Sequence, residues 1–240
     1  MAIDCSFDWS RIGSIVGPCL RPGGPALTRR ALKVCNFAPD FYLADIGCGT
    51  GGTLKNLVRA GFRNLTGIDC SEALLAQAGS YLKSAHLIQG NAENLPLKTN
   101  AFDALFCECV LSILNDKVSA LHEFNRVLKH NSFLIISDVF RKDNSAQREY
   151  ASESNEVMSN GLPGKEEITG FLSKFNFSLI LWEEHEKVLK EFAARMILAG
   201  EHLPNPWGCW QDRKEKKAGP LPISYFLLVA RKQKHSFPAN

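Results

Sequence analysis

The chain has 240 residues, and hydrophobic residue types make up 45% of them, which is enough for a sizeable core. Lys and Arg number 28 against 25 Asp and Glu, and this excess is too small to predict binding to nucleic acid. The longest apolar runs have the length of strands, well short of the roughly 18 residues of a membrane helix. The N-terminus shows no apolar secretory segment. We therefore expect a cytoplasmic protein with no membrane or nucleic-acid partner, and the oligomeric state stays open.

Eight cysteines are present, but their positions do not indicate a disulfide framework. Cys48, Cys70, Cys107 and Cys109 fall within or beside predicted core strands, whereas small secreted domains place cysteines in loops at regular spacing. We expect reduced and mostly buried thiols.

Strand-like apolar runs alternate with helical stretches from about residue 26 to residue 140. The lead-in before them is rich in Gly and Pro. The expected helices span residues 26–35, 54–60, 71–83 and 118–129, and the expected strands span 41–47, 65–69, 85–90, 102–108 and 132–140. Such alternation predicts a doubly wound α/β fold with a parallel sheet.

The pattern changes after Phe140. Residues 141–164 are polar, and a helix over 166–175, a strand over 177–182, an amphipathic stripe over 188–197 and a final strand over 222–232 follow. Nothing marks a second domain, so we expect one domain over residues 1–240.

The strongest local motif is the run Asp45-Ile46-Gly47-Cys48-Gly49-Thr50-Gly51-Gly52. Glycines allow a tight turn between strand and helix, and they let the backbone approach a ligand. Asp69 ends the next strand, where a carboxylate accepts hydrogen bonds from ribose hydroxyls. The two features together predict a ligand that contains adenosine, and on these residues alone NAD remains open.

Five segments resemble the class I S-adenosylmethionine-dependent methyltransferases, in the branch that includes ubiquinone/menaquinone and arsenite methyltransferases. They are LADIGCGTGG, GIDCSEALLAQA, QGNAENLPL, AFDALFCECVLSIL and EFNRVLKHNSFLIISDV, over about residues 41 to 140. The resemblance implies a three-layer α/β/α Rossmann-like sandwich with a mainly parallel seven-stranded sheet and an antiparallel last strand. It also implies S-adenosylmethionine as cofactor and S-adenosylhomocysteine as product, and makes NAD a poor candidate.

The resemblance assigns roles around the cofactor. The glycine turn faces the methionine moiety and the ribose through its backbone, Asp45 orients the ammonium, and the carbonyl of Cys107 accepts from it. Cys70 and residues 91–93 lie against the adenine, although the family usually has Asp at position 91. The implied set is Asp45, Gly47, Cys48, Gly49, Gly51, Asp69, Cys70, Asn91, Ala92, Glu93 and Cys107.

Methyl transfer from a sulfonium needs alignment more than a catalytic base. Glu108 and Cys109 are the candidates for a role toward the acceptor. Cys109 stands where arsenite methyltransferases have a metalloid-binding cysteine, but the further cysteine of those enzymes is replaced by Ser159 and Asn160, unless Cys209 substitutes for it. A lone C-x-C lacks the paired spacing of a zinc site, so no resident metal is expected.

We therefore expect a methyltransferase acting on a small molecule, with residues 1–35 and 141–164 covering the acceptor pocket. These segments are too short for a domain that recognises macromolecules. Two alternatives stay open: an arsenite methyltransferase, and a scaffold that binds S-adenosylmethionine without catalysis.

Overall fold

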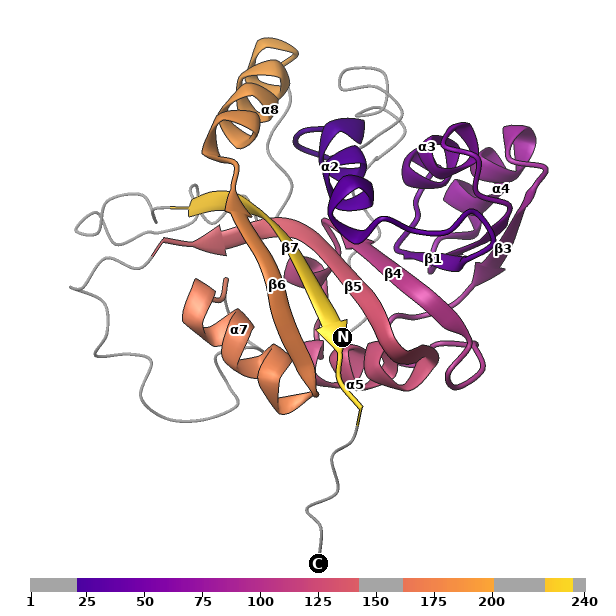
Figure 1. The fold of residues 1–240 in the computed structure, drawn as a ribbon. Coiled ribbons are helices and arrows are strands. Elements are labelled where there is room, and N and C mark those ends of the chain that lie inside the picture. Colours follow the sequence, from indigo (N-terminus) through magenta and orange to yellow (C-terminus); the bar gives the residue numbers. More distant parts are fainter. Residues whose placement is uncertain (1–20, 143–161, 201–222, 235–240) are drawn as a thin grey trace, which may run out of the picture.

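The computed structural model describes residues 21–142, 162–200 and 223–234 (Figure 1). Residues 1–20 and 143–161 of the two expected cover segments lie outside the described residues, as does Cys209. The expectation of a single domain over 1–240 therefore stays a prediction.

Seven strands form one sheet in the order β3-β2-β1-β4-β5-β7-β6. Their bounds are β1 Tyr42–Ile46, β2 Asn64–Asp69, β3 Ala85–Gln89, β4 Phe102–Glu108, β5 Leu128–Arg141, β6 Phe177–Glu184 and β7 Ile223–Lys232. The pairs among β1 to β5 are parallel, and β7 runs antiparallel to both β5 and β6. The predicted fold class, including the antiparallel last strand, is confirmed.

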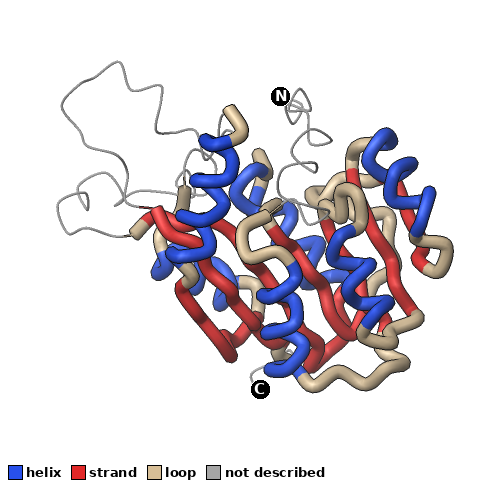
Figure 2. Tube along the Cα trace, turned by 90° about the horizontal axis from the view of Figure 1, so that it is seen from above, coloured by secondary structure: helices blue, strands red, loops and turns tan. Residues whose placement is uncertain are grey.

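Helices cover both faces of the sheet (Figure 2). On one face lie α2 (Pro25–Cys35), α3 (Gly52–Arg59) and α4 (Glu72–Tyr81), and on the other lie α5 (Lys117–Val127) and α7 (Lys165–Lys174). The 3₁₀ turn η1 (Leu111–Ile113) follows β4, and α8 (Glu186–Leu198) follows β6. Polar caps fix two helix starts as expected for Ser and Asp: Ser71 Oγ accepts from Leu74 N, and Asp116 Oδ1 accepts from Ser119 N.

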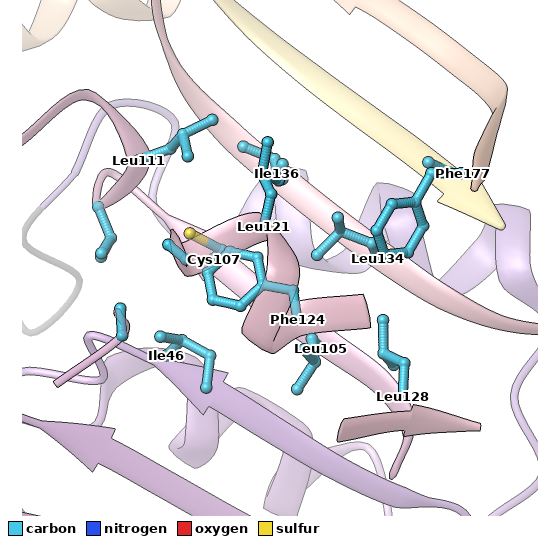
Figure 3. Close-up of a cluster of buried hydrophobic side chains, with 14 of the residues drawn as sticks. Ile46, Leu105, Cys107, Leu111, Leu121, Phe124, Leu128, Leu134, Ile136 and Phe177 are labelled. Atoms are coloured by element: carbon cyan, nitrogen blue, oxygen red, sulfur yellow. The ribbon is translucent and has the colours of Figure 1, made fainter. Parts of the chain in front are cut away.

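The central strands are buried because both faces carry helices. Leu105 and Cys107 of β4 and Leu134 of β5 are fully buried and pack with Phe124 of α5 (Figure 3). This dry core holds the carboxyl ends of β1, β2 and β4 in fixed relative positions, and the predicted site residues lie at those ends.

Strand β5 begins four residues earlier than the sequence predicts, at Leu128 instead of residue 132. The expected helix therefore ends at Val127 and not at 129. Within β5, Asn131 has φ 61°, which interrupts the extended backbone. The pairing of β5 with β4 shifts its register between Phe102 and Ala104.

Candidate functional site

The glycine turn joins β1 to α3 and is held against the neighbouring strand. The backbone N–H groups of Gly47 and Cys48 both donate to the carbonyl of Ile68, at 2.7 and 2.9 Å. Gly47, Gly49 and Gly51 have φ values of 69°, 53° and 80°, in the left-handed region that side chains disfavour. The turn thus requires glycine at these three positions for backbone reasons alone.

The surroundings of the three glycines differ. A Cβ at Gly47 would overlap Val110 Cγ2, and one at Gly51 would overlap Leu82 Cδ1. At Gly49 a Cβ would have no described atom within 4 Å. Gly47 and Gly51 therefore serve close packing within the protein, whereas Gly49 faces open space where a ligand can approach the backbone.

Asp69 lies against this turn from the end of β2. Its Oδ2 accepts from Gly49 N at 2.7 Å and its Oδ1 accepts from Ser71 N at 2.9 Å. Burial raises the pKa of the Asp69 carboxyl, and the backbone donors oppose that rise. Each carboxylate oxygen has a further lone pair, so the side chain remains able to accept from ligand hydroxyls.

Asp45, at the end of β1, is 3% exposed. Its carboxylate accepts no hydrogen bond from any residue within the described ranges. Its pKa lies well above the ordinary value because of burial and the neighbouring charges of Glu108 and Asp69, and Arg21 opposes this shift. A buried carboxylate without a donor is an energetically poor arrangement, and a cationic ligand would improve it.

Glu108, one of the two catalytic candidates, lies in a buried polar network. Its Oε2 pairs with Arg21 Nη2 at 2.8 Å and accepts from Thr53 Oγ1 at 2.5 Å, while its Oε1 accepts from Thr28 Oγ1 at 3.3 Å. The Glu108 and Arg21 side chains are 2% and 5% exposed. This carboxylate therefore ties the residues before and within α2 to the first turn of α3.

Arg21, Thr28 and Thr53 are site residues that the sequence analysis missed. Thr53 directly follows the glycine turn, and this position was the one available hint of its role. Nothing local distinguishes Arg21 from the remainder of the Gly- and Pro-rich lead-in.

Cys109, the other catalytic candidate, has φ 59°, and its thiol lies 3.0 Å from the hydroxyl of Tyr225. That hydroxyl also donates to the carbonyl of Ser137 at 3.2 Å. Burial raises the pKa of the Cys109 thiol well above its usual range, which favours the protonated form. A thiolate is what binds metalloids, so this environment does not favour the arsenite alternative.

The residues expected at the adenine have different surroundings. Cys70 is exposed, whereas Ala92 is buried in the core. Asn91 Oδ1 accepts from Glu93 N at 3.0 Å, and Glu93 Oε1 accepts from the N–H groups of Asn115 and Asp116 at 3.1 and 2.9 Å. The Glu93 carboxylate thus also holds the turn before α5, in addition to any role toward a ligand.

The implied roles of Cys48 and Cys107 are those of backbone groups, and their side chains are buried. Burial is the largest cause that raises the pKa of both thiols, so neither side chain offers a thiolate to a ligand. Among the described residues, no group of three or more His, Cys, Asp or Glu side chains is arranged to hold a metal ion.

Together, the structure brings Asp45, Asp69 and Glu108 to the carboxyl ends of adjacent strands around one turn, with Arg21 as a nearby cation. An excess of buried negative charge beside an open glycine suits a ligand that carries an ammonium and a sulfonium. S-adenosylmethionine is such a ligand, and in this respect the residues present fit it.

Comparisons with known proteins point to methyltransferases. A family model described as "Methyltransferase domain" matches residues 44–136, which include the glycine turn, Asp69 and Glu108. Over residues 44–136 the chain is therefore similar to a methyltransferase domain. The family model ends at residue 136, so it does not cover α8 or β7.

Curated relatives match over part of their length. An uncharacterised protein of Haemophilus influenzae is 30% identical over 136 residues, 53% of this chain and 54% of that protein. A ubiquinone/menaquinone biosynthesis C-methyltransferase of Campylobacter jejuni is 27% identical over 161 residues, 59% of this chain and 68% of that protein. The match thus spans about half the length of the first relative and about two thirds of the second.

Solved structures share the fold over nearly the whole chain. A [4+2]-cyclase has a TM-score of 0.72 at 21% identity and covers 93% of this chain and 92% of its own. A Haemonchus contortus phosphoethanolamine N-methyltransferase in complex with S-adenosylhomocysteine has a TM-score of 0.71 at 18% identity and covers 94% of this chain and 57% of its own. At this level of identity these likenesses show the fold alone.

No helix in the described ranges has both the length and the apolar character needed to cross a membrane.

Proposed function

We propose that this chain transfers the methyl group of S-adenosylmethionine to a small-molecule acceptor. The proposal depends on two features found together at the end of β1. Gly49 faces open space, and the buried carboxylate of Asp45 accepts no hydrogen bond from a described residue. The family match supports the cofactor, and the acceptor class is our own inference.

In this proposal each residue of the site has a distinct task. Asp45 stabilises the cofactor ammonium, Asp69 accepts from the ribose hydroxyls, and the carbonyl of Cys107 accepts from the same ammonium. When bound, the cofactor supplies a methyl group activated by a positively charged sulfur. We assign residues 70 and 91–93 to the adenine, where Asn91 would provide an amide oxygen in place of the carboxylate that the family usually has.

The expectation of a small acceptor is supported by what covers the carboxyl-end edge of the sheet. An apolar cluster joins α2, α8, β5 and β7 there, and its buried members are Leu27, Val139, Leu162, Leu189, Phe192, Met196 and Tyr225. The apolar stripe over residues 188–197 predicts the helix α8 but not its place over this edge. A site covered by single helices such as α2 and α8 suits a small and partly apolar acceptor.

The chain's contribution to the reaction is alignment and exclusion of water, because an in-line displacement at a methyl group needs no protein nucleophile. The hydrogen bonds of Glu108 to Thr28 and Thr53 favour a positioning role for it, in which it fixes α2 over the glycine turn.

The test is to measure cofactor binding and methyl transfer separately. Calorimetry with S-adenosylhomocysteine establishes binding, and labelled S-adenosylmethionine with a panel of small molecules, tRNA and protein establishes the acceptor class. We expect label on one or more small molecules. Label on tRNA or protein alone would contradict the acceptor class, and the absence of any binding would contradict the function.

Binding without transfer to any acceptor would indicate the scaffold alternative. Transfer must be measured directly because the fold is shared with a protein named as a [4+2]-cyclase. An arsenite-dependent turnover that is lost in Cys109→Ser would establish the metalloid alternative instead.

A further inference from the structure

A cavity of about 440 Å³ lies between the start of α2, one side of α3, and α8. Figure 1 shows these three helices grouped beside the carboxyl-end edge of the sheet. The lining contains no member of the predicted cofactor-binding set, although Gly52 of the lining directly follows Gly51. Its volume is within the roughly 300–1,000 Å³ of small-molecule sites.

Basic side chains from separate segments line this cavity. They are Arg21, Lys55, Arg59 and Arg195, and Glu191 is the single acidic residue of the lining. Arg59 and Arg195 are exposed and form no ion pair with any residue that the structure describes. The cavity therefore has an excess of positive charge, part of which lacks a counter-ion.

Two helices begin at this cavity, since Pro25 at the start of α2 and Gly52 at the start of α3 both line it. Neither helix has a side-chain N-cap or an acidic residue in its first turn, whereas α4, α7 and α8 each have an acidic residue there. The positive ends of two helix dipoles thus add to the charge of the arginines.

The remaining wall is partly apolar, with Val188 and Phe192 from α8. We propose that this cavity binds a small organic anion, whose phosphate or carboxylate group lies between Arg59 and Arg195 and whose apolar part contacts α8. Guanidinium groups suit both anions because they donate two parallel hydrogen bonds to either.

The experiment is calorimetry of the full chain at low salt with four probes: inorganic phosphate, pyrophosphate, glycerol 2-phosphate and citrate. We expect saturable binding of at least one probe at one site per chain. A preference for glycerol 2-phosphate over inorganic phosphate would indicate an organic phosphate, and a preference for citrate would indicate a carboxylate ligand.

The double variant Arg59→Gln/Arg195→Gln should weaken this binding by about tenfold or more, since two charge-assisted contacts are lost. The matched control is Arg29→Gln/Arg63→Gln, which removes the same charge from exposed positions outside the cavity. It should bind the probe within about twofold of the unmodified chain. Thermal unfolding of both variants checks that they remain folded.

Three results would overturn the proposal: no saturable heat with any probe, equal weakening in both double variants, or competition between the probe and S-adenosylhomocysteine. The last would mean that the anion enters the cofactor site. The measurement needs no methyl transfer, so its failure leaves the proposed function to its own test.

Discussion

Gly47 and Gly49 lie two residues apart in one turn, and the structure predicts that Gly47 matters more for stability and Gly49 more for ligand binding. Both have positive φ, so alanine at either position costs about 1–2 kcal/mol in backbone conformation. Only at Gly47 does the new methyl group also overlap Val110, which adds about 1–3 kcal/mol of overpacking. Gly47→Ala should therefore lower the free energy of unfolding by about 2–5 kcal/mol, and Gly49→Ala by about 1–2 kcal/mol.

For ligand binding we expect the larger effect at Gly49. The methyl group of Gly49→Ala points into the open space that the ligand is expected to fill, so the affinity for S-adenosylhomocysteine should fall at least about tenfold, or about 1.4 kcal/mol. Gly49→Val should weaken it further. Urea unfolding gives the stabilities, and calorimetry on material shown by circular dichroism to be folded gives the affinities.

Affinity within about twofold of the unmodified chain for Gly49→Ala would refute the assignment of that open space to the ligand. A Gly47→Ala variant as stable as Gly49→Ala would refute the packing argument.

Three further predictions concern the carboxylates. Asp69→Ala should weaken cofactor binding by about 1–3 kcal/mol, because ligand hydroxyls lose their acceptor, and unchanged affinity in calorimetry would contradict this role. Arg21→Met should destabilise the fold by about 3–5 kcal/mol by leaving Glu108 buried without its cation; adding Glu108→Gln should recover part of this loss in urea unfolding. Burial raises the pKa of Asp138 to about 6, above its unfolded value, so the folded state binds the proton more tightly and the free energy of unfolding should increase as the pH is lowered. The contribution of Asp138 between pH 7 and pH 5 is about 1 kcal/mol, and an unchanged pH dependence in Asp138→Asn would exclude it.

The part of the site that could be predicted from sequence is the part encoded locally. Asp45 and Asp69 each end a short apolar run, and parallel strands bring such ends to one edge of a sheet. The glycine turn lies between them in sequence, so its place beside both carboxylates follows from the strand-turn-helix pattern.

The network around Glu108 could not be predicted in this way. Its partners Thr53 and Thr28 are 55 and 80 residues away in sequence, and hydrogen bonds between single polar residues leave no periodic pattern. For the same reason the stripe of α8 predicts a helix but not its docking, because amphipathicity shows that one face is buried and not what it contacts.

The buried carboxylates of the site link the stability of the ligand-free protein to ligand binding. Asp45, Asp69 and Glu108 are buried together near one described cation, Arg21, and a buried charge without full compensation costs several kcal/mol in proteins. Apart from the polar partners of Glu108, the core beside them is apolar, and replacing Asp45 by a nonpolar residue should remove this penalty. An arrangement that disfavours the ligand-free fold is expected at a binding site, because the ligand provides the missing positive charge and gains affinity from doing so. By the same reasoning we propose that Asp45 interacts with the ligand, whereas Glu108, which pairs with Arg21 at 2.8 Å, has a structural role.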